Sequence, residues 1–258
     1  MKTTSKILVL FLSGLILFSS CKKKKDDPAP DPEPTPTPAP PTTWNGWCRV
    51  YNEYQYLIGG SGFSYMLSYS RAFFTADNLT TTVGYNINGI YGGMVISGSA
   101  DTLNYDGTYK VYEQNLASSL YSTPVNWRAA GSTGVPAFTT SCSETFPAMA
   151  LTVFTVFPSS VSKNAGLTVT LSGFTNTDRI LFTFQDNSGN YVSSGEKTLT
   201  SGSVTITFDG ASTAGMVNTS LGAMFLYCYN DEIKSAGGKN YRFSNSTEYF
   251  INGFNITN

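Results

Sequence analysis

Alternating hydrophobic and polar residues mark the strands in the second half of the chain. Apolar side chains occupy every second position at 167–171, 180–184 and 204–208, and mainly threonine lies between them. Period-two alternation places one face of a strand in a core and the other in water, as in antiparallel sheets. An apolar run at 223–229 and a last strand at 248–257 continue the series. About seven strands in this half predict an immunoglobulin-like sandwich.

The polar segments between these strands predict turns. Residues 186–190 read Asp-Asn-Ser-Gly-Asn, which is typical of a reverse turn, and a single carboxylate argues against a calcium loop. Residues 211–222 predict a loop or a short helical turn. A further loop is expected at 237–239, where two glycines precede a lysine.

The first half shows the same alternation in shorter and more polar segments. Phe63, Tyr65, Leu67 and Tyr69 share one face of a strand whose other face carries mainly serine. Further strands are predicted at 47–58, 80–87, 90–97, 108–113 and 125–130.

A turn-rich passage separates the two halves. Glycine, serine, threonine and proline cluster at 131–136, and Phe146-Pro147 precedes the next apolar run. The length of the remaining chain suits two domains of ordinary sandwich size. We therefore predict an all-β fold of two tandem antiparallel β-sandwich domains, at 44–147 and 148–258, the second one immunoglobulin-like.

The first twenty residues predict a secretory leader. Lys2 and Lys6 precede an apolar stretch at 7–18, which fits a signal peptide and is too short to span a bilayer. Small residues just before Cys21 resemble a lipobox, so residues 1–20 are expected to be a lipoprotein signal peptide and Cys21 the lipid-attachment residue. If an ordinary signal peptidase cut the chain instead, Cys21 would be a free thiol on a periplasmic or secreted protein.

Residues 21–43 are expected to be a disordered tether. Four lysines follow Cys21, and residues 28–41 alternate proline with Ala, Asp, Glu and Thr, a composition that favours polyproline II. Lys25-Asp26-Asp27 resembles the export signal of surface lipoproteins in Bacteroidota. The expected location is the outer membrane, lipid-anchored and exposed at the cell surface, with a periplasm-facing placement as the alternative.

The composition of the chain excludes several classes of function. From residue 44 onward the chain has ten Lys and Arg and thirteen Asp and Glu, without a basic cluster, which argues against nucleic-acid binding. Histidine is absent, which excludes Ser-His and Cys-His nucleophile pairs and the commonest zinc ligand. The one adjacent acidic pair, Asp231-Glu232, is expected in a solvated hairpin turn. We predict no catalytic residues, no metal site and no cofactor.

The remaining cysteines are Cys48, Cys142 and Cys228, an odd number for an oxidising compartment. Cys48 opens the first predicted strand and Cys142 lies near the end of the same domain. We expect a disulfide between Cys48 and Cys142, with Cys228 buried as a free thiol.

The lipobox, the proline tether, the passage at 134–138 and the stretch at 239–243 together resemble a family of two-domain surface lipoproteins of Bacteroidota. The resemblance covers most of the chain and implies its location and its paired β domains. The family brings no known activity and no site residues.

Three functions stay open, and the first is glycan binding by a non-catalytic surface module. Aromatic residues make up 14% of the chain, and Trp44, Trp47 and Trp127 lie in or beside the first domain, where a sugar-stacking platform is expected if one exists. The alternative is an adhesin or surface-assembly subunit that binds other proteins. The third is a glycan hydrolase with an unrecognised carboxylate pair. The ligand and its contact residues are left open.

Overall fold

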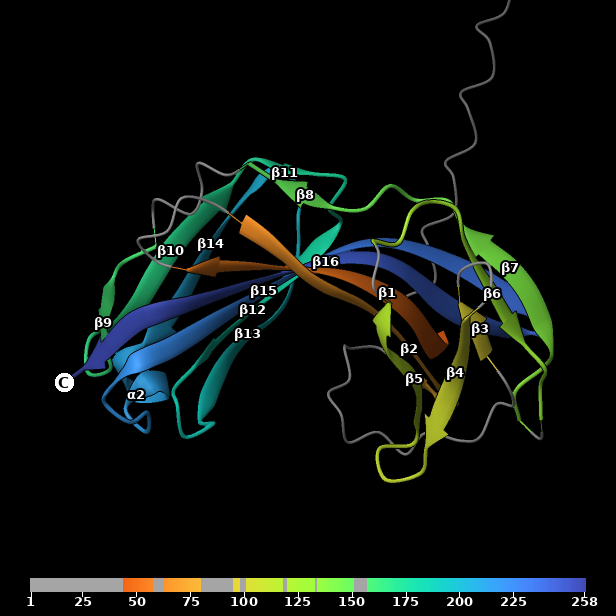
Figure 1. Ribbon diagram of the computed structural model, residues 1–258, viewed down its shortest axis with the longest axis horizontal. Helices are drawn as coiled ribbons and strands as arrows, with labels where there is room; N and C mark the ends of the chain where they lie inside the picture. The colour runs from red at the N-terminus through yellow and green to blue at the C-terminus, as the bar shows by residue number, and fades with distance from the viewer. Residues whose placement is uncertain are drawn as a thin grey trace, which may run out of the picture. The chain divides into compact units, whose positions relative to one another are not determined.

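The computed structural model describes residues 44–57, 63–79, 95–97, 101–117, 120–132, 134–150 and 157–258. Within these ranges the chain forms β-strands and one short helix, which confirms the predicted all-β fold (Figure 1). No helix among the described residues is long and apolar enough to cross a membrane.

Three long strands form the centre of the main sheet: β1 (Trp44–Leu57), β15 (Thr219–Ala236) and β16 (Lys239–Thr257) (Figure 1). β15 and β16 form an antiparallel hairpin around Gly237 and Gly238. β16 also pairs with β1 in parallel, in a register that runs from Trp47 opposite Arg242 to Leu57 opposite Asn252. The first and last described strands of the chain therefore lie side by side.

Among the described residues the main sheet has twelve strands, with the order β13-β12-β15-β16-β1-β2-β5-β4-β3-β6-β7 and with β9 paired to β16. On the β1 side lie β2 (Phe63–Leu79), β5 (Val111–Ala117), β4 (Asp101–Asp106), β3 (Val95–Ser97), β6 (Val125–Ala129) and β7 (Phe138–Cys142). On the β15 side lie β12 (Arg179–Gln185) and β13 (Tyr191–Thr198), and β9 spans Ser160–Ser162. Two small sheets pair β10 (Gly166–Ser172) with β14 (Ser203–Asp209), and β11 (Phe174–Thr175) with β8 (Ala148–Met149). Helix α2 (Gly210–Thr213) follows β14, and the side chain of Asp209 caps it.

Two hydrophobic clusters pack on one face of the main sheet. The N-terminal core contains Val50 of β1, Phe74 of β2 and Phe243 of β16. The C-terminal core contains Phe182 of β12 and Ile251 of β16, together with the inward residues of β10 and β14. β16 therefore contributes to both cores, first through its beginning and then through its end.

Between the two cores this face carries buried polar side chains of β15 and β16, among them Asn230, Asn245 and Thr247, and the segment 144–147 crosses over them. Side chains of the central strands hold this segment by its carbonyl groups: Asn245 Nδ2 donates to Glu144 O at 2.5 Å, and Asn230 Nδ2 donates to Thr145 O at 2.8 Å. Thr247 Oγ1 donates to Pro147 O at 2.6 Å. The predicted domain boundary falls on this segment. The division into domains 44–147 and 148–258 stays a prediction, because β1 and β16 form one sheet across it.

Several strands differ from their predicted bounds. The strand predicted at 108–113 begins later, at Val111 of β5, because residues 107–110 form a turn between β4 and β5. The predicted last strand at 248–257 begins earlier, at Lys239. The strand predicted at 80–87 lies outside the described residues, and of 90–97 only Val95–Ser97 is described. The reverse turn at 186–190 is confirmed, since Asp186 N donates to Asn190 O at 2.9 Å.

Candidate functional site

The other face of the main sheet carries arginines, aromatic rings and acids. Residues opposite each other on neighbouring strands share a face. Arg71 of β2 is opposite Arg49 of β1, which is opposite Ser244 of β16, which is opposite Asp231 of β15. We call this surface the arginine–aromatic face. It consists of Trp47, Arg49, Tyr51, Tyr69, Arg71, Phe73, Arg179, Tyr227, Tyr229, Asp231, Arg242, Ser244 and Glu248.

Arg179 is the centre of an ion-pair network on this face. The residue is 5% exposed, and its guanidinium binds the carboxylates of Asp231 and Glu196. Arg242 Nη1 lies 3.5 Å from Glu196 Oε2, and its Nε lies 3.9 Å from Asp231 Oδ2. The expectation that Asp231-Glu232 lies in a solvated turn is therefore wrong: both residues are in β15, and Asp231 balances buried arginines.

Trp47 is packed between three guanidinium groups. Arg49 Cζ lies 4.3 Å, Arg179 Cζ 4.6 Å and Arg242 Cζ 5.5 Å from its ring centroid. Its Nε1 donates to Ser244 Oγ at 2.5 Å. Cation–π packing of this kind stabilises a buried arginine that has lost part of its hydration. Trp47 is therefore a structural residue of the sheet.

None of the three tryptophans forms the sugar-stacking platform that the sequence suggested. Trp44, Trp47 and Trp127 are 1%, 0% and 1% exposed. The ring of Trp44 is covered by Arg242, whose Cζ lies 3.6 Å from its centroid, and Trp127 packs in the N-terminal core. Exposed aromatic rings in the first half occur instead on the hairpin β4–β5, at Tyr105 (37%) and Tyr109 (50%).

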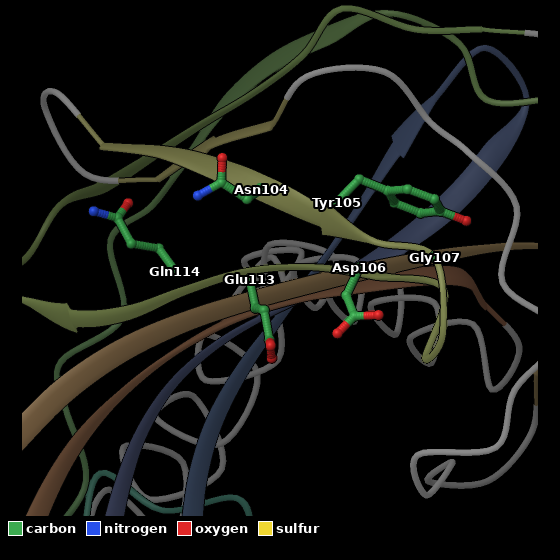
Figure 2. Close-up of a pocket in the computed structure, with 6 residues that line it drawn as sticks. All are labelled: Asn104, Tyr105, Asp106, Gly107, Glu113 and Gln114. Carbon is green, nitrogen blue, oxygen red and sulfur yellow. The ribbon is translucent and has the colours of Figure 1, made fainter.

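An open pocket of about 660 Å³ lies at this hairpin (Figure 2). We call it the hairpin pocket. It is lined by Asn104, Tyr105, Asp106, Gly107, Glu113 and Gln114. In Figure 2 the carboxylates of Asp106 and Glu113 point to the same side of the hairpin. Amide groups both donate and accept hydrogen bonds and carboxylates accept them, so this lining suits a ligand rich in hydroxyl groups.

The turn that closes the hairpin is built by Asp106. Its Oδ1 accepts hydrogen bonds from Thr108 N at 2.7 Å and from Tyr109 N at 3.2 Å. Lys110 then adopts a positive φ of 55°, which returns the chain into β5. The ring of Tyr105 packs on that of Tyr112, with centroids 5.1 Å apart. The buried ring of Tyr112 therefore supports the exposed ring of Tyr105.

An ion pair links the hairpin pocket to the arginine–aromatic face. Glu113 Oε2 accepts from Arg71 Nη2 at 2.8 Å, with side-chain exposures of 22% and 14%. Arg71 is opposite Arg49 in the β1–β2 register. Asn104 is opposite Glu113 in the β4–β5 register. One row of polar side chains thus crosses four strands, from β4 to β1.

Glu248 lies on the same face, farther along β16. It accepts a hydrogen bond from Tyr69 Oη at 2.6 Å, and its register partner on β1 is another acid, Glu53. Burial is the main cause that raises the pKa of Glu248, to about 7, and the charge of Glu53 raises it further. Burial also raises the pKa of Glu53.

The cysteines predicted to form a disulfide are close in the fold but not bonded. Cys48 and Cys142 both lie in the N-terminal core, and both are buried free thiols, as is Cys228. The disulfide expected between Cys48 and Cys142 is therefore absent from this structure. Cys21, the predicted lipid-attachment residue, lies outside the described residues.

Sequence reasoning missed the hairpin pocket and the arginine–aromatic face, although each has a signal. Asp106-Gly107 between two polar strands is a hairpin signal. Trp47, Arg49 and Tyr51 alternate along one strand, which places an arginine between two aromatic rings on one side. The ion pairs to Arg179 had no such signal, because their partners come from other strands.

No protein-family model matches this chain, and no curated protein matches it. Within the described ranges, no group of three or more His, Cys, Asp or Glu side chains is placed to hold a metal ion. The kind of ligand that the hairpin pocket suits is therefore inferred from the side chains that line it.

Proposed function

We propose that this chain is a non-catalytic, lipid-anchored cell-surface protein that binds a glycan in the hairpin pocket. The observation that carries the proposal is the lining of this pocket, which combines two amides, two carboxylates and the exposed ring of Tyr105. Sugars offer hydroxyl groups to amides and carboxylates, and the apolar face of a sugar ring packs on an aromatic ring. The pocket is open, which suits a polymer that enters from the side.

The two carboxylates of the pocket favour binding over hydrolysis. Glu113 is ion-paired with Arg71 at 2.8 Å, and Asp106 Oδ1 accepts the two backbone hydrogen bonds that close the turn. Both carboxylates thus have structural partners. A glycan hydrolase that uses Asp106 and Glu113 is the alternative that shares this pocket. Release of reducing ends from a bound polysaccharide would favour that alternative.

The proposed location rests on the leader and the tether. A lipid on Cys21 and the proline-rich segment at 28–41 hold the folded part away from the membrane. The resemblance to two-domain surface lipoproteins of Bacteroidota supports exposure at the cell surface. Treatment of intact cells with a protease or with a membrane-impermeant amine reagent tests this placement. If the protein is cleaved or labelled only after the outer membrane is opened, the periplasmic side is favoured.

Retention on immobilised polysaccharides tests glycan binding. We expect the full mature chain to be retained by at least one polysaccharide, and Tyr105→Ala or Asn104→Ala to lose most of that retention. The matched control is Tyr191→Ala, which removes an exposed ring (66%) from β13 instead. Equal retention of the wild type and both pocket variants would contradict the proposal, provided that their melting temperatures agree.

A protein-binding adhesin is the second candidate, and the strand β13 favours it. β13 ends the main sheet, and among the described strands it pairs in that sheet with β12 alone. Edge strands offer unpaired backbone groups to a partner strand, and Tyr191 presents a ring there. Oligomers that increase with concentration and disappear when β13 carries a proline, as in Ser193→Pro, would favour this function.

A further inference from the structure

Arg49 is held between two buried aromatic rings on the arginine–aromatic face. Its Cζ lies 4.3 Å from the ring centroid of Trp47 and 4.8 Å from that of Tyr51. The three residues alternate along β1, so their side chains emerge on the same side of the strand. Trp47 and Tyr51 are 0% and 1% exposed, whereas Arg49 stays partly exposed. The guanidinium is thus held in place by the two rings, and the residue as a whole is partly exposed.

Arg49 has no acidic partner among the described residues. The other three arginines of this face are ion-paired: Arg71 with Glu113, and Arg179 and Arg242 with Asp231 and Glu196. The register partners of Arg49 are instead Arg71 on β2 and Ser244 on β16. Its Nε is buried without a hydrogen-bond partner.

One acid on the same face, Glu248, interacts with the charge of Arg49, but its carboxylate is hydrogen-bonded to another residue. The donor of this hydrogen bond is Tyr69 Oη, at 2.6 Å. A guanidinium is always charged, and a partly buried charge without a counter-ion is costly. A preorganised arginine of this kind suits a bidentate anion such as a carboxylate or a sulfate.

The position of Arg49 relative to the hairpin pocket suggests where this anion comes from. Glu113 lines the pocket, its partner Arg71 is on the next strand, and Arg49 is on the strand after that. Neighbouring strands are about 4.8 Å apart, so the backbones at Glu113 and Arg49 are separated by about 10 Å. A ligand longer than a single sugar would bridge this distance.

We propose that Arg49, flanked by Arg71, binds the acidic group of a saccharide in the hairpin pocket, so that the ligand is an acidic glycan. This inference rests on the proposed function, which it deepens by naming the ligand class. The recognised chemistry is a planar carboxylate, as in a uronic acid, or a sulfate ester. Arg71 adds charge and stays oriented by Glu113.

The test compares acidic sugars with neutral forms of the same backbone. The probes are oligogalacturonate and its methyl ester, and a sulfated oligosaccharide and its desulfated form. We expect the full mature chain to bind one of the acidic forms at least about tenfold more tightly than its neutral form, a preference that falls with salt. Arg49→Gln is expected to remove most of that preference, while Arg49→Lys keeps part of it because the charge stays but the planar fork is lost.

The matched control is Arg128→Gln, which removes an exposed arginine from β6 and should leave the preference unchanged. A second readout is the melting temperature in sodium sulfate against sodium chloride of equal ionic strength. We expect extra stabilisation by sulfate in the wild type that is absent in Arg49→Gln, whereas the general salting-out effect of sulfate is common to both.

The outcomes separate the two proposals. Equal binding of acidic and neutral forms would overturn the role of Arg49 and leave glycan binding in place. No saccharide bound, but a sulfate effect that depends on Arg49, would overturn the glycan function and leave an anion site. No saccharide bound and no such sulfate effect would overturn both.

Discussion

The buried acid Glu248 is expected to make the stability of the protein depend on pH. Four groups face it: Tyr69 from β2, Tyr227 from β15, and Glu53 and Arg49 from β1. Burial disfavours its charged form and raises its pKa from 4.5 to about 7. The folded state therefore holds this proton more tightly than the unfolded chain. The contribution of Glu248 to stability is therefore fully present below the pKa of this residue in the unfolded chain, and it is lost as pH rises to about 7.

Glu248→Gln tests this linkage. From pH 5 to pH 8 we expect the wild type to lose up to about 3 kcal/mol of unfolding free energy through this residue, and the variant to avoid that loss. Urea unfolding at the two pH values measures it. Glu144→Gln, which changes a partly exposed carboxylate, is the control and should keep the pH dependence of the wild type. The same pH dependence in both variants would contradict the role of Glu248.

The three core cysteines give a second prediction at the scale of the residue. Cys48, Cys142 and Cys228 are buried free thiols, and burial raises the pKa of each, for Cys142 to about 12. We expect them to react slowly with thiol reagents in the folded protein, because the thiolate is the reactive form. Denaturation without a reductant should expose all three at once. A single reactive thiol would show that Cys48 and Cys142 are bonded after all.

At the scale of the element, the strand pair β10–β14 depends on Gly166. This residue has φ +81°, and a Cβ at this position would lie 2.1 Å from Phe208 O. Gly166→Ala is expected to cost about 3 kcal/mol, since it combines a left-handed backbone with a clash against the partner strand. Chemical unfolding curves give this value.

Gly195 offers a matched control for this substitution. It also has a positive φ, of +65°, but nothing lies within 4 Å of its Cβ position. Gly195→Ala should therefore cost only about 1 kcal/mol, the penalty of the left-handed backbone itself. Equal losses for the two variants would mean that the contact with Phe208 does not matter.

Strands that alternate between a buried and a more exposed face were predictable. Alternation at 167–171, 180–184 and 204–208 matches β10, β12 and β14 to within a residue at each end. The parallel pairing of β1 with β16 was not predictable, because periodicity shows which face of a strand is buried but not which strand lies beside it. For the same reason, periodicity did not show which residues surround Trp47. Its sequence neighbours suggest an exposed aromatic platform, and two of the three arginines that pack on it come from β12 and β16.

At the scale of the whole molecule, the central strands predict cooperative unfolding of both cores. β16 contributes Phe243 to the N-terminal core and Ile251 to the C-terminal core. Phe182→Leu, in the C-terminal core alone, should lower stability by about 1–2 kcal/mol. The three tryptophans all lie outside that core. We nevertheless expect their fluorescence transition to shift with the rest of the molecule.

Thermal unfolding followed by tryptophan fluorescence and by far-ultraviolet circular dichroism measures this coupling. The control is Val125→Ala in the N-terminal core, which should shift both signals together. If Phe182→Leu splits the transition and leaves the fluorescence midpoint in place, residues 44–147 and 148–258 unfold as the independent domains that the sequence predicted.

The parallel pair β1–β16 also has a consequence for how the chain reaches its fold. Trp47 and Ser244, which share a hydrogen bond, are 197 residues apart. During synthesis β1 emerges long before the strand that completes its hydrogen bonds. Until then the edge of β1 that faces β16 stays unpaired, while β2 can already pair with its other edge. A pause in synthesis before residue 239 would therefore leave a form with an open strand edge, which is prone to aggregation.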